Sequence, residues 1–276
     1  MGKILLGARW DEPSQNPRLN RAREAGLIDY IEANYPITSA EGPDLEVPTP
    51  VFVHCPVNPI ASPHGYNRQL ASVIKQAADR YDSPWIGEHL CWAGPEDEGR
   101  LGYIITPILC DEAHQIAVEN ILEIKDFYGR PLALELAPQY APTGTFPSEM
   151  HFLAAVARDS DAHILLDVAH WTASNRNLGR PADYGLDALD FNRIIELHVA
   201  GVRCGKSSPF WHDSHGDVPD EEILSLSESL LHSLPALRAI TFEHDEIAFE
   251  DDLFAVLEHL RRMLNEVNGQ TKIAAR

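Results

Sequence analysis

The chain has 276 residues, with 42 Asp or Glu against 22 Lys or Arg, so its formal net charge is −20. So negative a protein repels phosphates, which argues against duplex nucleic acid as a partner. Apolar residues make up 44% of the chain, enough for a large core, so intrinsic disorder is disfavoured. No apolar run approaches the roughly 18 residues of a membrane span, and residues 4–8 are too short for a secretory signal core. We expect a cytoplasmic protein that binds neither membrane nor nucleic acid.

The four cysteines give no sign of a disulfide framework or a thiolate metal site. They are Cys55, Cys91, Cys110 and Cys204. They show neither CxxC pairing nor zinc-ribbon spacing, and they are too few for a disulfide scaffold in a chain of this length. We expect reduced thiols, most of them in the core.

A short apolar run rich in β-branched residues recurs eight times along the chain. The runs are 3–7, 27–32, 50–54, 84–89, 131–136, 163–167, 193–198 and 239–243. Nearly continuous apolar runs are typical of strands buried on both faces, as in parallel sheets.

Segments with helical periodicity separate many of these runs. They are 66–81, 111–128, 148–158, 221–233 and 250–267. We expect Asp111 and Ser148 to cap their helices, and only fragments of helix between 171 and 190, where glycine and proline recur. Strands alternating with helices over this length predict one α/β domain over residues 1–276, a (β/α)8 TIM barrel. A doubly wound open sheet is the alternative, but no glycine-rich phosphate loop follows the first run.

An imidazole or a carboxylate lies at or next to the end of six consecutive runs. These residues are His54, His89, Glu135, Asp167, His198 and Glu243. In a parallel barrel, the carboxyl ends of all strands open at one mouth, where active sites lie. We therefore expect these six side chains to share one space. His170, which follows Asp167 by three residues, and Asp213 and His215 in the stretch FWHDSHGD are expected to join them.

Such a concentration of buried carboxylates predicts bound metal. Like charges a few ångströms apart cannot all ionise without cations. Nine ligands exceed the needs of one ion and suit two or three. The absence of cysteine among them disfavours thiolate zinc and iron–sulfur clusters. Mixed imidazole and carboxylate ligation fits Fe(II), Mn or Zn, and a two-His-one-carboxylate pattern favours non-haem iron.

Strand neighbourhood divides the nine predicted ligands into three sets. The sets are His54, His89 and Glu135; His170, Asp213 and His215; and Asp167, His198 and Glu243. Glu135 is expected to bridge between sets. We expect His212, His244 and Arg203 to support the centre without binding metal. The remaining histidines are expected to have no part in it: His64, His114, His151, His163, His232 and His259.

Six short motifs in a fixed order resemble one known family. The motifs are WIGEHLCW at 85–92, then LALELAP, ILLDVAH, IIELHVAG, HDSHG and TFEHD, preceded by EANY at 32–35. They resemble the DUF692 proteins, the multinuclear non-haem iron-dependent oxidative enzymes (MNIO), which are related to xylose-isomerase-like TIM barrels. The resemblance covers about residues 27–245. The metal residues that it implies are His54, His89, Glu135, Asp167, His198, Asp213, His215 and Glu243.

The chain departs from this family at the sixth predicted strand. Where the family commonly has two asparagines after the aspartate, this chain has Ala169 and His170. A histidine there is similar to the DxxH of the related trinuclear apurinic endonucleases. By that similarity, His170 is a ligand of a third ion.

The resemblance also implies an activity. It implies two or three iron ions of mixed Fe(II)/Fe(III) valence, dioxygen as co-substrate, and oxidation of a cysteine or nearby residue in a ribosomally synthesised precursor peptide. It further implies a partner protein that binds the leader of that peptide. Three alternatives stay open. They are a metal-dependent phosphodiester hydrolase, which the charge of −20 disfavours, a sugar isomerase or epimerase with one ion and a proton-transfer base, and a metal-storing or partner-binding scaffold.

Overall fold

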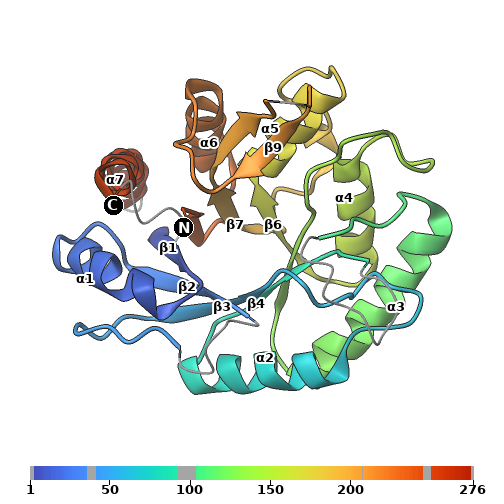
Figure 1. The fold of residues 1–276 in the computed structure, drawn as a ribbon, viewed down its shortest axis with the longest axis horizontal. Helices are drawn as coiled ribbons and strands as arrows, with labels where there is room; N and C mark the ends of the chain where they lie inside the picture. Colours follow the sequence, from blue (N-terminus) through green and yellow to red (C-terminus); the bar gives the residue numbers. More distant parts are fainter. Residues whose placement is uncertain (1–2, 36–41, 93–103, 207, 245–249, 275–276) are drawn as a thin grey trace.

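Parallel strands close into a barrel, with helices around it (Figure 1). The computed structural model describes residues 3–35, 42–92, 104–206, 208–244 and 250–274. In chain order, the barrel strands are β1 (Leu5–Trp10), β2 (Tyr30–Asn34), β3 (Val51–Cys55), β4 (Ile86–His89), β5 (Leu132–Glu135), β6 (His163–Asp167), β7 (Ile194–Val199) and β10 (Ala239–Phe242). Each is hydrogen-bonded to its neighbours in the order β1-β10-β7-β6-β5-β4-β3-β2. The predicted TIM barrel is confirmed.

The helices alternate with the strands much as the periodicity predicts. They are α1 (Asn16–Glu24), α2 (Arg68–Tyr81), α3 (Asp111–Tyr128), α4 (Glu149–Asp159), α5 (Val168–Asn177), α6 (Glu221–Ser233) and α7 (Glu250–Ala274), with short 3-10 turns η1 (Pro13–Gln15) and η2 (Leu186–Ala188). Ser148 caps α4 as predicted, because its side chain accepts a hydrogen bond from the backbone N–H of His151. The prediction for α3 is wrong by one position. Cys110 is the N-cap, and Asp111 lies in the first turn, where a carboxylate still favours the helix dipole.

Helix α5 corrects the expectation of mere fragments after β6. It follows β6 directly and continues to Asn177. Asp167 is its N-cap, since one carboxylate oxygen (Oδ1) accepts a hydrogen bond from the backbone N–H of His170 at 2.6 Å. Residues 168–175 are all buried, so the helix lacks the polar face that periodicity needs. Gly179, with φ +63°, lies just beyond its end.

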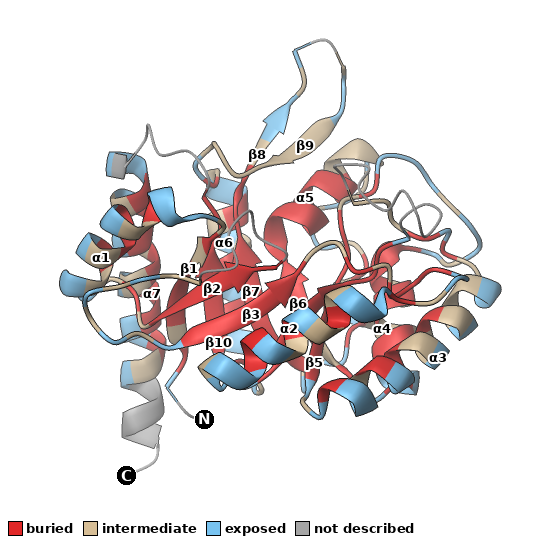
Figure 2. Cartoon of the chain, turned by 60° about the horizontal axis from the view of Figure 1, so that its bottom comes forward, coloured by how far each residue is buried: buried red, intermediate tan, exposed pale blue. Residues whose placement is uncertain are grey.

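An antiparallel hairpin, which the sequence pattern did not predict, follows β7. It consists of β8 (Gly201–Cys204) and β9 (Trp211–Ser214). Figure 2 shows the hairpin standing clear of the buried barrel strands. Its partly exposed strands are too short to produce a hydropathy period.

A packed apolar layer fills the lower part of the barrel interior. Its buried members are Tyr30, Phe52, Trp85, Ala133, Leu165, Ile195 and Ala239. The Tyr30 and Phe52 rings stack with centroids 4.1 Å apart. Gly7 makes room for this stack, because a Cβ there would lie 2.3 Å from the ring of Tyr30. The polar side chains above this layer therefore rest on a close-packed floor.

All four cysteines are free. Cys55 and Cys91 are buried as expected, whereas Cys110 is half-buried and Cys204 is exposed, so the core holds two of the four. None of the described helices combines the length and apolar character that crossing a membrane would require.

Candidate metal centre

Three neighbouring strands bring the first predicted ligand set together. His54, His89 and Glu135 lie at or next to the carboxyl ends of β3, β4 and β5. One Glu135 oxygen (Oε2) is 2.9 Å from Nε2 of His89 and 3.4 Å from Nε2 of His54. All three side chains are buried. Their ligand atoms lie within 4.8 Å of one another, close enough to hold one metal ion.

A second predicted set lies beside the first. Asp167, His198 and Glu243 also place their ligand atoms within 4.8 Å of one another. Nδ1 of His198 is 3.5 Å from Oε2 of Glu243 and 3.6 Å from Oε2 of Glu135. Glu135 therefore faces both sets.

The third predicted set connects the barrel to the hairpin. Asp213, on β9, has its Oδ2 atom 3.3 Å from Nε2 of His170 and 2.7 Å from Nε2 of His215. Nδ1 of His170 is 3.1 Å from Oε1 of Glu135, and Nε2 of His215 is 3.3 Å from Oε2 of Glu243. The structure thus brings all nine predicted residues into one connected cluster.

The cluster contains buried polar atoms that the protein leaves without hydrogen bonds. They include both carboxylate oxygens of Glu135, Oδ2 of Asp167, Oδ1 of Asp213 and Nδ1 of His198. Buried polar atoms are normally paired, and an exception needs a physical explanation. These oxygen and nitrogen atoms belong to neighbouring side chains of the cluster and are types that can coordinate metal. A divalent metal ion fits them because it would satisfy their lone pairs and offset the carboxylate charges.

Burial and neighbouring charges shift the pKa values of these groups. Burial disfavours the charged form of Glu135, but the His89 and His198 imidazoles outweigh it and hold its pKa well below the usual range. For Asp167, burial prevails over the attraction of His170 and raises the pKa to about 7. Burial lowers the pKa of His54 to about 4, against the opposing pull of Glu135 and Glu32. The His54 imidazole is therefore neutral at pH 7, which is the form that binds metal.

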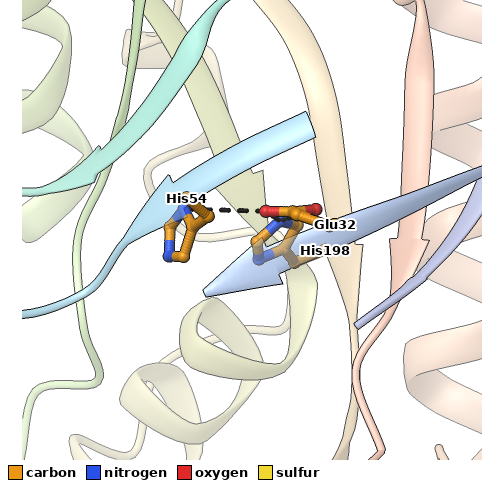
Figure 3. A group of neighbouring side chains, drawn as sticks. All are labelled: Glu32, His54 and His198. Carbon is orange, nitrogen blue, oxygen red and sulfur yellow. Dashed lines mark hydrogen bonds and ion pairs between the residues drawn. The ribbon is translucent and has the colours of Figure 1, made fainter. Parts of the chain in front are cut away.

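Two residues at this mouth were not among the predicted ligands. Glu32, on β2, points into the barrel toward His54 and His198, and the three form a further compact group (Figure 3). It ends the second predicted strand and opens the EANY motif, so the strand-end signal was present. Nη1 of Arg9 contacts His215 and lies 3.7 Å from Oε1 of Glu243. Arg9 lies beyond the predicted end of the first strand.

The three residues expected to support the centre lie on its flank. Arg203 forms an ion pair with Asp217, with Nε 2.7 Å from Oδ2. His212 faces Arg203 across the hairpin and packs its ring 5.3 Å from that of Tyr140. His244 is buried just after β10. Their support of the centre stays a prediction.

An aromatic rim stands beside the cluster. Tyr140 is 40% exposed and Phe210 is 38% exposed, and their rings meet edge-on with centroids 5.9 Å apart. Burial raises the pKa of the Tyr140 hydroxyl, and the nearby Asp213 carboxylate adds to this. The rim is thus within electrostatic reach of the cluster while offering apolar surface to solvent.

These features define a TIM barrel with a buried imidazole–carboxylate centre at its mouth. Residues 38–265 match the family described as RiPP precursor modification enzyme MbnB/TglH/ChrH, that is, the MNIO or DUF692 family of enzymes acting on ribosomally made peptides. The chain belongs to this family, as its motifs predicted. A relative named UPF0276 protein, from Caulobacter vibrioides, is 27% identical over 251 residues, which cover 90% of this chain and 83% of the relative.

Solved structures confirm the xylose-isomerase-like fold. A xylose isomerase-like TIM barrel protein from Mycobacterium smegmatis, in complex with magnesium, has a TM-score of 0.61 at 12% identity, covering 96% of this chain and 97% of its own. Endonuclease IV from Thermus thermophilus has a TM-score of 0.55 at 16% identity, covering 95% of this chain and 99% of its own. At these identities the likeness concerns the fold alone.

Proposed function

We propose that this chain is a multinuclear non-haem iron enzyme that uses dioxygen to oxidise a cysteine, or a residue near it, in a ribosomally synthesised precursor peptide. A partner protein that binds the peptide leader would present the substrate. Family membership supports a precursor peptide as substrate. We place the reaction in the cytoplasm, in keeping with four free cysteines.

One observation carries the metal assignment. Glu135 is buried among four imidazoles, those of His54, His89, His170 and His198, at distances of 2.9 to 3.6 Å. Neither of its oxygens has a hydrogen-bond partner. A carboxylate in this setting fits a bridging ligand between cations better than a structural ion pair, which would be hydrogen-bonded.

We assign all nine predicted residues as ligands of two or three iron ions. They are His54, His89, Glu135, Asp167, His170, His198, Asp213, His215 and Glu243. Imidazole and carboxylate donors without thiolate suit iron in mixed Fe(II)/Fe(III) states. Iron, when bound, would supply electron transfer to dioxygen and would lower the pKa of a coordinated substrate thiol.

The protein's own residues would hold and shield this centre. The Asp167 carboxylate caps α5 through Oδ1, which fixes His170 while Oδ2 stays free of hydrogen bonds. The Arg9 guanidinium, beside His215 and Glu243, offsets part of the carboxylate charge. The side chains of Asp213 and His215 are 17% exposed, more than the deeper ligands. We therefore expect substrate to enter on the hairpin side, with water excluded from the floor.

Anaerobic purification with iron analysis, followed by co-expression, tests this proposal. The chain is co-expressed with the leader-binding partner and each short cysteine-bearing peptide encoded beside its gene, and peptide masses are compared with and without oxygen. We expect two or three irons per chain and a mass change that requires oxygen. An iron-loaded enzyme that alters none of these peptides would contradict the proposal.

The position of His170 favours a metal-dependent phosphodiester hydrolase as the second candidate. Its ring lies between Glu135 and Asp213, where it could hold a third ion. Strand cleavage of abasic DNA by zinc-loaded protein, lost in His170→Ala, would establish that function. The net charge of −20 argues against it. A single ion per chain would instead favour an isomerase or epimerase.

A further inference from the structure

A chain of buried polar side chains runs down the barrel interior beneath the metal cluster. The Thr241 hydroxyl donates to Oε2 of Glu32 and lies 3.2 Å from Oε1 of Glu196. The Tyr30 hydroxyl donates to the same Glu196 oxygen at 3.0 Å, and Trp85 donates its indole N–H to the other at 2.6 Å. All five side chains are buried. The apolar floor is thus tied through hydrogen bonds to Glu32.

Glu32 differs from Glu135 in how its oxygens are used. Both Glu32 oxygens lie 3.0 Å from Nε2 of His198, and one also accepts from Thr241. Both Glu135 oxygens, by contrast, lack a hydrogen-bond partner. Since protein donors already occupy Glu32, it fits a supporting carboxylate, whereas Glu135 fits a metal ligand.

The two histidines beside Glu32 present opposite ring edges to it and to the cluster. In His198, Nε2 faces Glu32 and Nδ1 faces Glu243 and Glu135. In His54, Nδ1 lies 3.6 Å from Oε1 of Glu32, and Nε2 lies 3.4 Å from Oε2 of Glu135. A carboxylate that accepts an N–H from one ring nitrogen leaves the lone pair on the other. The His198 ring is therefore set to offer that lone pair to the cluster, whereas the longer contact between His54 and Glu32 is not a hydrogen bond.

We propose that Glu32 is a positioning residue that fixes the orientation and tautomer of His198 and does not itself bind metal. The inference rests on the metal centre of the proposed function and adds a residue beyond the nine assigned ligands. Thr241, Glu196, Tyr30 and Trp85 hold the Glu32 carboxylate in place. Carboxylates in this role typically contribute 10- to 100-fold to metal affinity.

Metal binding by Glu32→Gln tests the proposal without any peptide. Purified apo protein is titrated anaerobically with Co²⁺, and both affinity and the visible d–d spectrum are recorded. We expect unchanged stoichiometry, about 10- to 100-fold weaker binding and an altered spectrum, because glutamine cannot replace the anionic acceptor. Glu88→Gln is the matched control. Glu88 is equally buried and adjacent to His89, but it faces outward to the Tyr128 hydroxyl at 2.6 Å, so we expect wild-type binding.

Two results would overturn this role for Glu32. Binding within about threefold of wild type with an unchanged spectrum would show that His198 does not depend on it, and the loss of one whole ion would make it a ligand. Should Glu32→Gln not fold, Thr241→Val removes only the hydroxyl donor, and we expect weaker Co²⁺ binding with the same spectral change; wild-type behaviour would again contradict the role. Wild-type protein that binds no Co²⁺ would contradict the centre itself. Failure of the peptide assay alone would leave Glu32's role intact.

Discussion

The face of the strand on which a residue lies decides whether it joins the metal centre. On β3, His54 points into the barrel, while Cys55 packs in the outer core. On β4, His89 faces the cluster, while Glu88 accepts a hydrogen bond from Tyr128 outside the barrel. This is the two-residue alternation of strands. Chemically similar neighbours therefore have different roles.

Alanine substitution should distinguish the proposed metal ligands from a histidine outside the centre. His89→Ala and Asp213→Ala should each lower bound iron and abolish peptide modification, because each removes a donor from the cluster. His114→Ala should change neither, since Nε2 of His114 lies 3.1 Å from Asp159 on α4, in a separate ion pair. Elemental analysis and peptide mass spectrometry measure the two effects. If all three variants behave alike, the assignment of ligands is wrong.

Gly87 leaves the space that the His54 ring occupies. A Cβ at position 87 would lie 2.4 Å from Nδ1 of His54. Gly87→Ala should therefore displace this imidazole and weaken Co²⁺ binding at least tenfold, in line with the sensitivity of supporting contacts. Gly269→Ala, on α7, is the matched control, because nothing lies within 4 Å of its added Cβ. Equal Co²⁺ affinity in both variants would show that the His54 ring tolerates the shift.

The sequence revealed the nine clustered residues but neither Glu32 nor Arg9. Six of the nine follow from strand ends, which parallel topology brings to one mouth, and His170, Asp213 and His215 follow from stretches beyond those ends. Glu32 was omitted although the second predicted strand ends there; β2 continues to Asn34, so Glu32 lies inside the strand. Arg9 was missed because the first strand was predicted to end at residue 7, whereas β1 reaches Trp10. Strands buried on both faces lack the alternation that would fix their ends.

Helix α5 and the hairpin complete the centre at the level of elements. Both follow strands that carry predicted ligands. The sequence pattern predicted only fragments of helix where α5 lies, and it did not predict the hairpin. The reason differs between them: α5 is buried on every side, and the hairpin strands are short and partly exposed. Tertiary contacts stabilise these two elements, so the local periodicity of the sequence does not reveal them. Yet Asp167 caps α5 and Asp213 lies on β9, so ligand geometry depends on both.

The aromatic rim beside the hairpin should affect peptide handling and not metal binding. Tyr140→Ala and Phe210→Ala remove exposed apolar surface next to Asp213. We expect peptide conversion to need about 10- to 100-fold more substrate, with unchanged iron content, since burying an apolar side chain of this size contributes about 1.5–3 kcal/mol. Phe127→Ala, on α3, is the control, being 42% exposed. Iron loss in the rim variants, or equal conversion in all three, would contradict this role.

The two ends of the barrel differ in how their polar groups are hydrogen-bonded. The mouth contains the buried polar atoms of the cluster that lack hydrogen bonds, whereas the Asp29 carboxylate, near the opposite end, is hydrogen-bonded. That carboxylate accepts hydrogen bonds from Lys3 at 2.7 Å, from the Leu6 backbone N–H at 3.0 Å and from Arg261 on α7 at 2.8 Å. In TIM barrels the amino-terminal end typically serves stability and the carboxyl-terminal end serves function.

Asp29→Asn should therefore lower stability without affecting metal. Burial raises the pKa of Asp29, but Lys3, Leu6 and Arg261 together hold it below its usual value. A lowered folded-state pKa gives stability that is present above the unfolded pKa of about 3.9 and is lost as pH falls through the folded value. We expect the variant to lose about 1.5–3 kcal/mol of unfolding free energy at pH 7, and the difference from wild type to shrink below about pH 4.

Urea unfolding across this pH range and Co²⁺ titration measure the two parts of that prediction. Asp161→Asn is the matched control, because the Asp161 side chain is 82% exposed in its ion pairs with Arg193 and Lys125, and exposed pairs contribute about 1 kcal/mol or less. Weakened Co²⁺ binding in Asp29→Asn would mean that the two ends of the barrel are coupled. A stability loss that does not change with pH would mean that the charge of Asp29 is not what holds the barrel's lower end together.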